Sequence, residues 1–162
     1  MDAVEYYNKI KPSYERLYGE EQKEKIDEIL RLIEVKPNQK IIDVGAGAGL
    51  LEKILKQNMI TALEPSELAD LIPKRENIKI IRKRLEKFST KEKFDLVFCI
   101  TVLQDIEKEK REDFIKRLFS LCKKEGFILI SVLKRSGIDL DDYSPVSKKE
   151  IGNDVLYIFE KR

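Results

Sequence analysis

The sequence predicts an α/β fold: a doubly wound, seven-stranded and mostly parallel sheet with a C-terminal antiparallel hairpin and helices on both faces. Stretches 94–100 and 127–133 are almost wholly apolar, as expected of parallel strands that helices cover on both sides. An earlier strand, 40–44, leads into closely spaced glycines and then into apolar residues at helical spacing. The two residues Gly152-Asn153 separate the last two strands, which suits a type II′ hairpin.

The first 36 residues are predicted to form an N-terminal helical segment. Pro12 interrupts the apolar spacing of residues 4–19, so this part is expected to be two short helices or a helix and a turn. Residues 20–34 carry apolar side chains at a spacing of three and four on a charged background, which predicts a surface helix. The tyrosines of the first part are expected to pack on the sheet with their hydroxyl groups outward.

The stretch after the first strand carries the clearest sign of a ligand site. Gly45, Gly47 and Gly49 alternate with alanines before a helix expected over residues 49–58. Glycine lets the backbone turn sharply and lets a ligand approach closely. The free N–H groups and positive dipole end of the following helix favour an anionic or nucleotide-like ligand over this turn.

A second strand, 60–63, ends at Glu64. A carboxylate at such a strand end can accept hydrogen bonds from the two hydroxyl groups of a ribose. The remaining elements are a short helix at 67–71, a strand at 78–81, a helix at 108–123, a turn ending at Gly126, and closing strands at 146–151 and 154–160.

Composition limits the classes of function. A chain of 162 residues is expected to form one domain, residues 1–162. A net charge of +2 gives no strong signal for nucleic-acid binding. No apolar run is long enough to cross a membrane and no secretory signal opens the chain, so the cytoplasm is the expected compartment. Abundant Lys and Glu, without Trp or His, suggest a heat-adapted source.

Metal chemistry is not predicted. Cys99 and Cys122 lie in apolar contexts and are expected to be core residues. The chain has no histidine, and therefore lacks the commonest general base and metal ligand.

The glycine pattern, with Asp43 two residues before Gly45 and with Glu64 closing the second strand, resembles the class I (Rossmann-like) S-adenosylmethionine (SAM)-dependent methyltransferases of the small, single-domain type. The nicotinamide-dinucleotide pattern would need a small residue at position 50, where this chain has Leu50. The resemblance implies SAM as the cofactor and a short N-terminal helical lid over it. The residues it assigns to the cofactor are Asp43, Gly45, Ala46, Gly47, Gly49, Glu64, Pro65, Leu85, Glu86, Cys99, Ile100, Tyr14 and Tyr18.

One position departs from the family pattern. Related methyltransferases usually place an acid after the third strand to bind the adenine amino group, and this chain has Arg84 there. The main-chain N–H of Leu85 is then the expected adenine contact. Transfer of a sulfonium methyl needs an aligned nucleophile more than acid–base groups. Asp105 is the candidate base, ahead of Glu107, and both also fit as acids at a helix N-terminus.

Three functions are compatible with the sequence. The first is a SAM-dependent methyltransferase acting on an unidentified acceptor, either a small molecule or a group that a partner presents. The second is a non-catalytic methyltransferase-like module that binds SAM or a partner. The third is a nicotinamide-dependent oxidoreductase, which Leu50 disfavours.

Overall fold

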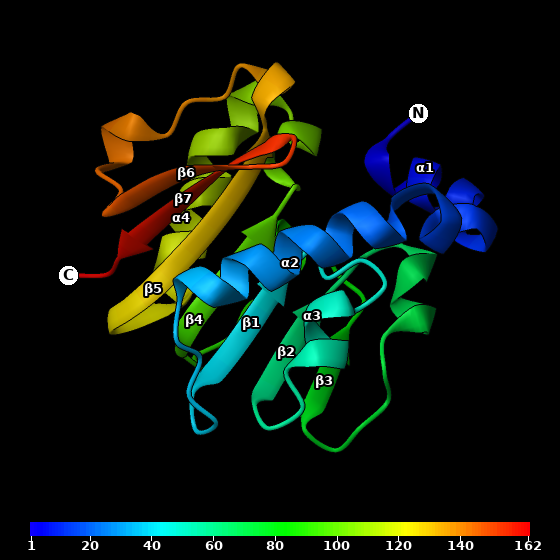
Figure 1. Cartoon of the computed structure of the whole chain (residues 1–162), viewed down its shortest axis with the longest axis horizontal. Helices are drawn as coiled ribbons and strands as arrows, with labels where there is room; N and C mark the ends of the chain where they lie inside the picture. The colour runs from blue at the N-terminus through cyan, green and yellow to red at the C-terminus, as the bar shows by residue number, and fades with distance from the viewer.

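A seven-stranded sheet in the order β3-β2-β1-β4-β5-β7-β6 forms the centre of the computed structural model, which describes residues 1–162 (Figure 1). Strands β1 to β5 pair in parallel, and β7 runs antiparallel to both β5 and β6. The predicted parallel sheet with a closing hairpin is therefore confirmed. The strands are β1 (Lys40–Val44), β2 (Met59–Leu63), β3 (Ile78–Ile81), β4 (Phe94–Ile100), β5 (Cys122–Leu133), β6 (Ser147–Ile151) and β7 (Asp154–Glu160).

Helices cover both faces of this sheet, as predicted. Helices α2 (Glu20–Leu32) and α3 (Leu50–Ile54) pack on the face that carries Ile41 of β1. Helix α4 (Arg111–Leu121) packs on the other face, which carries Ile42. Alternate side chains of β1 thus pack into the hydrophobic cores on opposite faces of the sheet, because successive side chains of a strand point to opposite faces.

The N-terminal segment stays helical but changes its winding twice before α2. Helix α1 (Ala3–Ile10) ends before Pro12, which lies in a 3-10 turn at Lys11–Ser13, and a wide helical turn at Glu15–Gly19 then joins α2. The predicted interruption at Pro12 is confirmed, since proline cannot donate the next helical hydrogen bond. Figure 1 shows α1 beyond the ends of the parallel strands toward which their arrows point.

Ion pairs and a hydrogen bond at both ends of α1 hold it against the rest of the fold. Asp2 caps α1 and also pairs with Arg84 at 2.5 Å, whereas the side chain of Asn8 accepts a hydrogen bond from the N–H of Glu67. Lys11 pairs with Asp70 at 2.5 Å. Arg84, where the family pattern has an adenine-binding acid, here holds the start of the N-terminal helix.

Two predicted boundaries were wrong. Helix α3 ends at Ile54, because Asn58 is buried and its amide donates to main-chain oxygens of the loop before β1. Strand β5 begins at Cys122, so the predicted turn at Gly126 lies inside it, where the register against β4 shifts. A Cβ at Gly126 would lie 2.6 Å from the main-chain oxygen of Asp95, so close strand packing requires glycine there.

The closing hairpin has the predicted turn. Ile151 pairs with Asp154, and Gly152 has φ +54° while Asn153 keeps a negative φ, as a type II′ turn requires. None of the helices is both long and apolar enough to cross a membrane.

Candidate functional site

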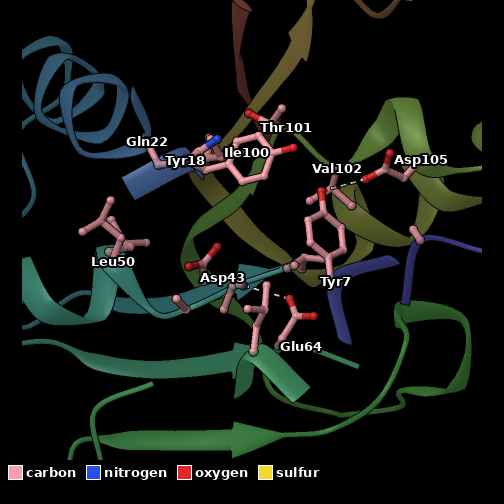
Figure 2. Close-up of a pocket in the computed structure, with 18 of the residues that line it drawn as sticks. Tyr7, Tyr18, Gln22, Asp43, Leu50, Glu64, Ile100, Thr101, Val102 and Asp105 are labelled. Atoms are coloured by element: carbon pink, nitrogen blue, oxygen red, sulfur yellow. Dashed lines mark hydrogen bonds between the residues drawn. The ribbon is translucent and has the colours of Figure 1, made fainter. Parts of the chain in front are cut away.

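A cavity of about 1100 Å³ lies at the carboxyl ends of β1, β2 and β4, beneath the N-terminal helices (Figure 2). In open α/β sheets, ligands bind outside the carboxyl ends of the strands, at the point where the strand order reverses. β1 neighbours β2 on one side and β4 on the other, so the change of direction occurs at β1. The volume exceeds the range of about 300–1000 Å³ typical of ligand pockets, leaving room for more than one small molecule.

The glycine turn after β1 forms the floor of the cavity. Gly47 has φ +56°, and a Cβ on it would point at the hydroxyl of Tyr14, 3.4 Å away. Gly45 has φ +78°, and a Cβ there would lie 2.4 Å from a methyl group of Val102. Both positions need glycine for the backbone angle and for the space above the turn.

Glu64 ties the end of β2 to this turn. Its Oε2 accepts a hydrogen bond of 2.8 Å from the N–H of Gly47, and its Oε1 accepts bonds from the N–H and the hydroxyl of Ser66 at 3.0 and 2.7 Å. A carboxylate offers about four acceptor positions, so one position on Oε2 stays open toward a ligand hydroxyl. Glu64 can accept hydrogen bonds from both ribose hydroxyl groups, as the sequence predicts, only if the hydrogen bond from the Gly47 N–H breaks when the ligand binds.

A second carboxyl group, that of Asp43, lies on the cavity wall between Leu50 and Glu64 in the view of Figure 2. The carboxyl group of Glu52, fully buried in α3, is its acidic neighbour. Burial and this acidic neighbour raise the pKa of Asp43 well above its usual value. Burial also raises the pKa of Glu52 to about 7.

Tyrosines of the N-terminal segment form the roof. The rings of Tyr7, Tyr14 and Tyr18 contact one another in series, with centroids 6.4 and 5.7 Å apart. Burial raises the pKa of Tyr7, and it raises the pKa of Tyr14 to about 12. Their hydroxyl groups therefore stay protonated and can donate hydrogen bonds into the cavity.

The loop after β4 forms the wall opposite Glu64. The hydroxyl of Tyr7 donates to Asp105 Oδ2 at 3.4 Å, as Figure 2 shows. Asp105 is solvent-exposed on one side, but the roof desolvates it enough to raise its pKa, and the Tyr7 bond opposes that rise. Gln104 donates from its amide to the main-chain oxygen of Thr101 at 2.6 Å, which leaves its amide oxygen without a donor.

A buried polar cluster holds this loop. Thr101 has φ +58°, unusual for a β-branched residue, and its hydroxyl accepts from Lys25 Nζ at 2.7 Å and donates to Asp154 Oδ2 at 2.7 Å. Lys25 Nζ also lies 3.1 Å from Asp154 Oδ1, an ion-pair contact without hydrogen-bond alignment. Ser131 donates to the same Asp154 carboxylate, so α2, β4, β5 and β7 meet here.

A profile of the family described as "Methyltransferase domain" matches residues 17–156. The chain belongs to this methyltransferase family. The resemblance to the class I SAM-dependent methyltransferases is thereby confirmed, and with it the expectation of an enzyme. Residues 1–16, which carry Tyr7 and Tyr14 of the roof, lie outside the matched range.

Solved methyltransferases share the fold. Magnesium protoporphyrin IX methyltransferase from Synechocystis PCC 6803 with bound SAM aligns with a TM-score of 0.74 and 14% identity, over 98% of this chain and 95% of that chain. N-methyltransferase NodS from Bradyrhizobium japonicum WM9 in complex with S-adenosylhomocysteine (SAH) gives 0.61 and 16%, over 76% and 77%.

Coclaurine N-methyltransferase bound to N-methylheliamine and SAH gives a TM-score of 0.60 and 16% identity, over 67% of this chain. The aligned part spans only 34% of that longer enzyme. None of the curated proteins matches the sequence.

The methyltransferase cavity brings together most of the predicted cofactor residues. Those on its wall are Asp43, Gly45, Ala46, Gly47, Glu64, Pro65, Leu85, Glu86, Ile100, Tyr14 and Tyr18, together with the candidate base Asp105. Gly49 and Cys99 do not line it. Gly49 instead lets α3 start against Ile72, whose Cα would lie 2.9 Å from an added Cβ, and Cys99 is buried in the core.

Several residues of the site escaped the sequence analysis. Lys25, Gln22 and Val102 line the cavity, and Tyr7 does so as the partner of Asp105. Glu107, the second candidate base, instead forms an exposed ion pair with Lys110. The structure contains no group of three or more His, Cys, Asp or Glu side chains that could hold a metal ion.

Proposed function

We propose that this methyltransferase binds SAM over the glycine turn and methylates a small molecule held between the cofactor and the loop after β4. The observation that carries the proposal is a large cavity in which the glycine turn, Asp43 and Glu64 face Tyr7 and Asp105. Three solved methyltransferases of the same fold hold SAM or SAH. One of them is a magnesium protoporphyrin IX methyltransferase, and another is bound to the small molecule N-methylheliamine.

The residues on the floor fit the cofactor. Gly45 and Gly47 leave the space that a side chain would fill, Glu64 keeps one acceptor position for a ribose hydroxyl, and Asp43 offers a carboxyl group to the methionine ammonium. Leu85 and Glu86 lie on the wall where the adenine is expected. SAM, when bound, supplies a methyl group on a sulfonium that is already activated for displacement.

The protein's own part in the reaction is to hold and align the acceptor. Tyr14 and Tyr18 cover the floor, and Tyr7 and Asp105 stand at the acceptor side. Asp105 is positioned to accept the proton that a hydroxyl or protonated amine acceptor releases, and the Tyr7 hydrogen bond stabilises its charged form.

Calorimetric titration with SAM, SAH and NADH tests the proposal. We expect both adenosyl ligands to bind in the micromolar range and NADH not to bind. Binding of NADH alone would contradict the proposal. Tight SAM binding without turnover, over a broad panel of amine and hydroxyl acceptors, would instead favour a non-catalytic SAM-binding module.

A further inference from the structure

Asp43 and Glu52 form a pair of buried carboxyl groups behind the glycine turn. Asp43 is 5% exposed and Glu52 is fully buried. Neither side-chain oxygen of Glu52 has a hydrogen-bond partner, and the nearby Asp43 carboxyl group acts on it electrostatically. Two ionised carboxylates would repel each other strongly at this depth, so the pair retains at least one proton.

None of the other acidic groups near Asp43 and Glu52 favours ionisation of both carboxyl groups. Glu64 at the end of β2 is a further acid, and its charge disfavours ionisation of both Asp43 and Glu52. Tyr14 in the roof and Cys99, on the other face of β4, are the further titratable groups that the charge of Asp43 affects; burial raises the pKa of each, so both remain neutral.

Arg75, from the loop before β3, is the one cation near the pair. Its guanidinium donates to the main-chain oxygen of Glu52 rather than to the carboxylate, and its Nε is buried without a partner. The positive charge of Arg75 favours the ionised form of Glu52, which places the remaining proton on Asp43. Only Asp43 of the pair lines the cavity.

We propose that Glu52 is a positioning residue that shares a proton with Asp43, and that docking of the ligand's ammonium group at Asp43 releases this proton to solvent. The inference rests on the proposed binding of SAM or SAH. The O–H bond of the pair breaks and the proton passes to the buffer. The ligand's ammonium keeps its own protons and compensates the carboxylate that is left.

Proton counting tests this without requiring an acceptor. Titrations of the purified chain with SAH, in two buffers of different ionisation enthalpy, give the number of protons released per ligand bound. At about pH 6.5 the α-amino group of the ligand is fully protonated in solution, so its own titration adds nothing. We expect a release of about half to one proton per SAH, and an affinity that rises with pH by up to about tenfold per unit.

Two controls isolate the pair. The ligand 5′-methylthioadenosine keeps the adenosine and the thioether but lacks the amino-acid part, so its binding should release no proton. The variant Glu52→Gln presents an amide N–H to Asp43 in place of the shared proton, so SAH should bind with proton release close to zero. Glu67→Gln, an exposed carboxylate on the same side of the sheet, should behave as the unaltered protein does.

The outcomes separate this inference from the proposed function. SAH binding without proton release in the unaltered protein would overturn the shared proton, and it would mean that Arg75 compensates Glu52 while Asp43 is already ionised. Equal release in Glu52→Gln, or equal release with 5′-methylthioadenosine, would also overturn it. Failure of SAM and SAH to bind at all would overturn the proposed function, and this inference with it.

Discussion

The main-chain N–H of Gly47 donates a hydrogen bond of 2.8 Å to Glu64 Oε2, which fastens the glycine turn after β1 to the end of β2. The two residues face the same cavity. Glu64 therefore has two tasks in this methyltransferase, since it shapes the turn and keeps one acceptor position for the ligand.

The substitution Glu64→Ala removes both the hydrogen bond that shapes the glycine turn and the acceptor position for the ligand. We expect SAM binding to weaken by about 1.5–3 kcal/mol, the range for hydrogen bonds to charged groups. Calorimetry with SAH measures the loss, and Glu67→Ala is the matched control because the Glu67 side chain is exposed on the next turn of the chain. An unchanged dissociation constant in Glu64→Ala would remove Glu64 from the binding site.

Gly47→Val should abolish SAM binding while the protein still folds. The new side chain would fill the space below Tyr14, and the positive φ adds backbone strain of about 1–2 kcal/mol. Gly137→Val carries similar strain at φ +69° with no atom within 4 Å of the new Cβ, so it serves as the control and should bind normally. Normal SAH binding by Gly47→Val would show that the ligand does not lie over this turn.

Asp105→Asn should lower kcat by about 100- to 10,000-fold, as expected for loss of a general base, and leave SAH affinity unchanged. Glu107→Gln, which alters the exposed acid two residues further on, should have little effect. Conversion of SAM to SAH with an acceptor found by screening provides the assay. Equal turnover in Asp105→Asn would assign the carboxylate a structural role only.

The pH profile adds an independent check on Asp105. Partial desolvation raises its pKa, and only the ionised form can accept a proton, so the rate should rise with pH through that pKa and level off above it. The Tyr7 hydrogen bond lowers the same pKa. Tyr7→Phe should therefore shift the rising limb to higher pH, and a shift to lower pH would contradict the pairing.

Lys25→Met should destabilise the fold by about 3–5 kcal/mol, because it leaves the buried Asp154 carboxylate without its cation. Lys23→Met, on the exposed side of the same helix, is the control and should cost little. The double variant Lys25→Met/Asp154→Asn should recover part of the loss. Chemical denaturation gives each free energy of unfolding, and equal losses for the two lysine variants would contradict a buried ion pair.

Local patterns in the sequence predicted the sheet, the glycine turn and the closing hairpin correctly. Each depends on residues close together in the chain, such as the apolar run of β4 or Gly152 at the first position of its turn. Helix ends were less predictable, because α3 stops where the side chain of Asn58 finds main-chain partners near residue 36, far from the helix.

The parts of the site that escaped prediction are long-range pairs. Tyr7 meets Asp105 across 98 positions of the chain, and Lys25 reaches Thr101 across 76. Nothing in the local sequence distinguishes Lys25 from the exposed Lys23 of the same helix, or Glu52 from an exposed helical acid such as Glu24. Only the packing of α2 and α3 on β1 shows that these two charged side chains are buried.

Titration of the ¹⁵N-labelled chain with SAH, followed by nuclear magnetic resonance, tests most directly whether SAM binds over the glycine turn. The chain, at 19.0 kDa, is of a suitable size for this method. We expect the largest amide shifts at Gly45, Gly47 and Glu64, with further shifts from Ile100 to Val102 and none in β6. Shifts confined to another surface, or no shifts at saturating SAH, would contradict SAM binding over the glycine turn.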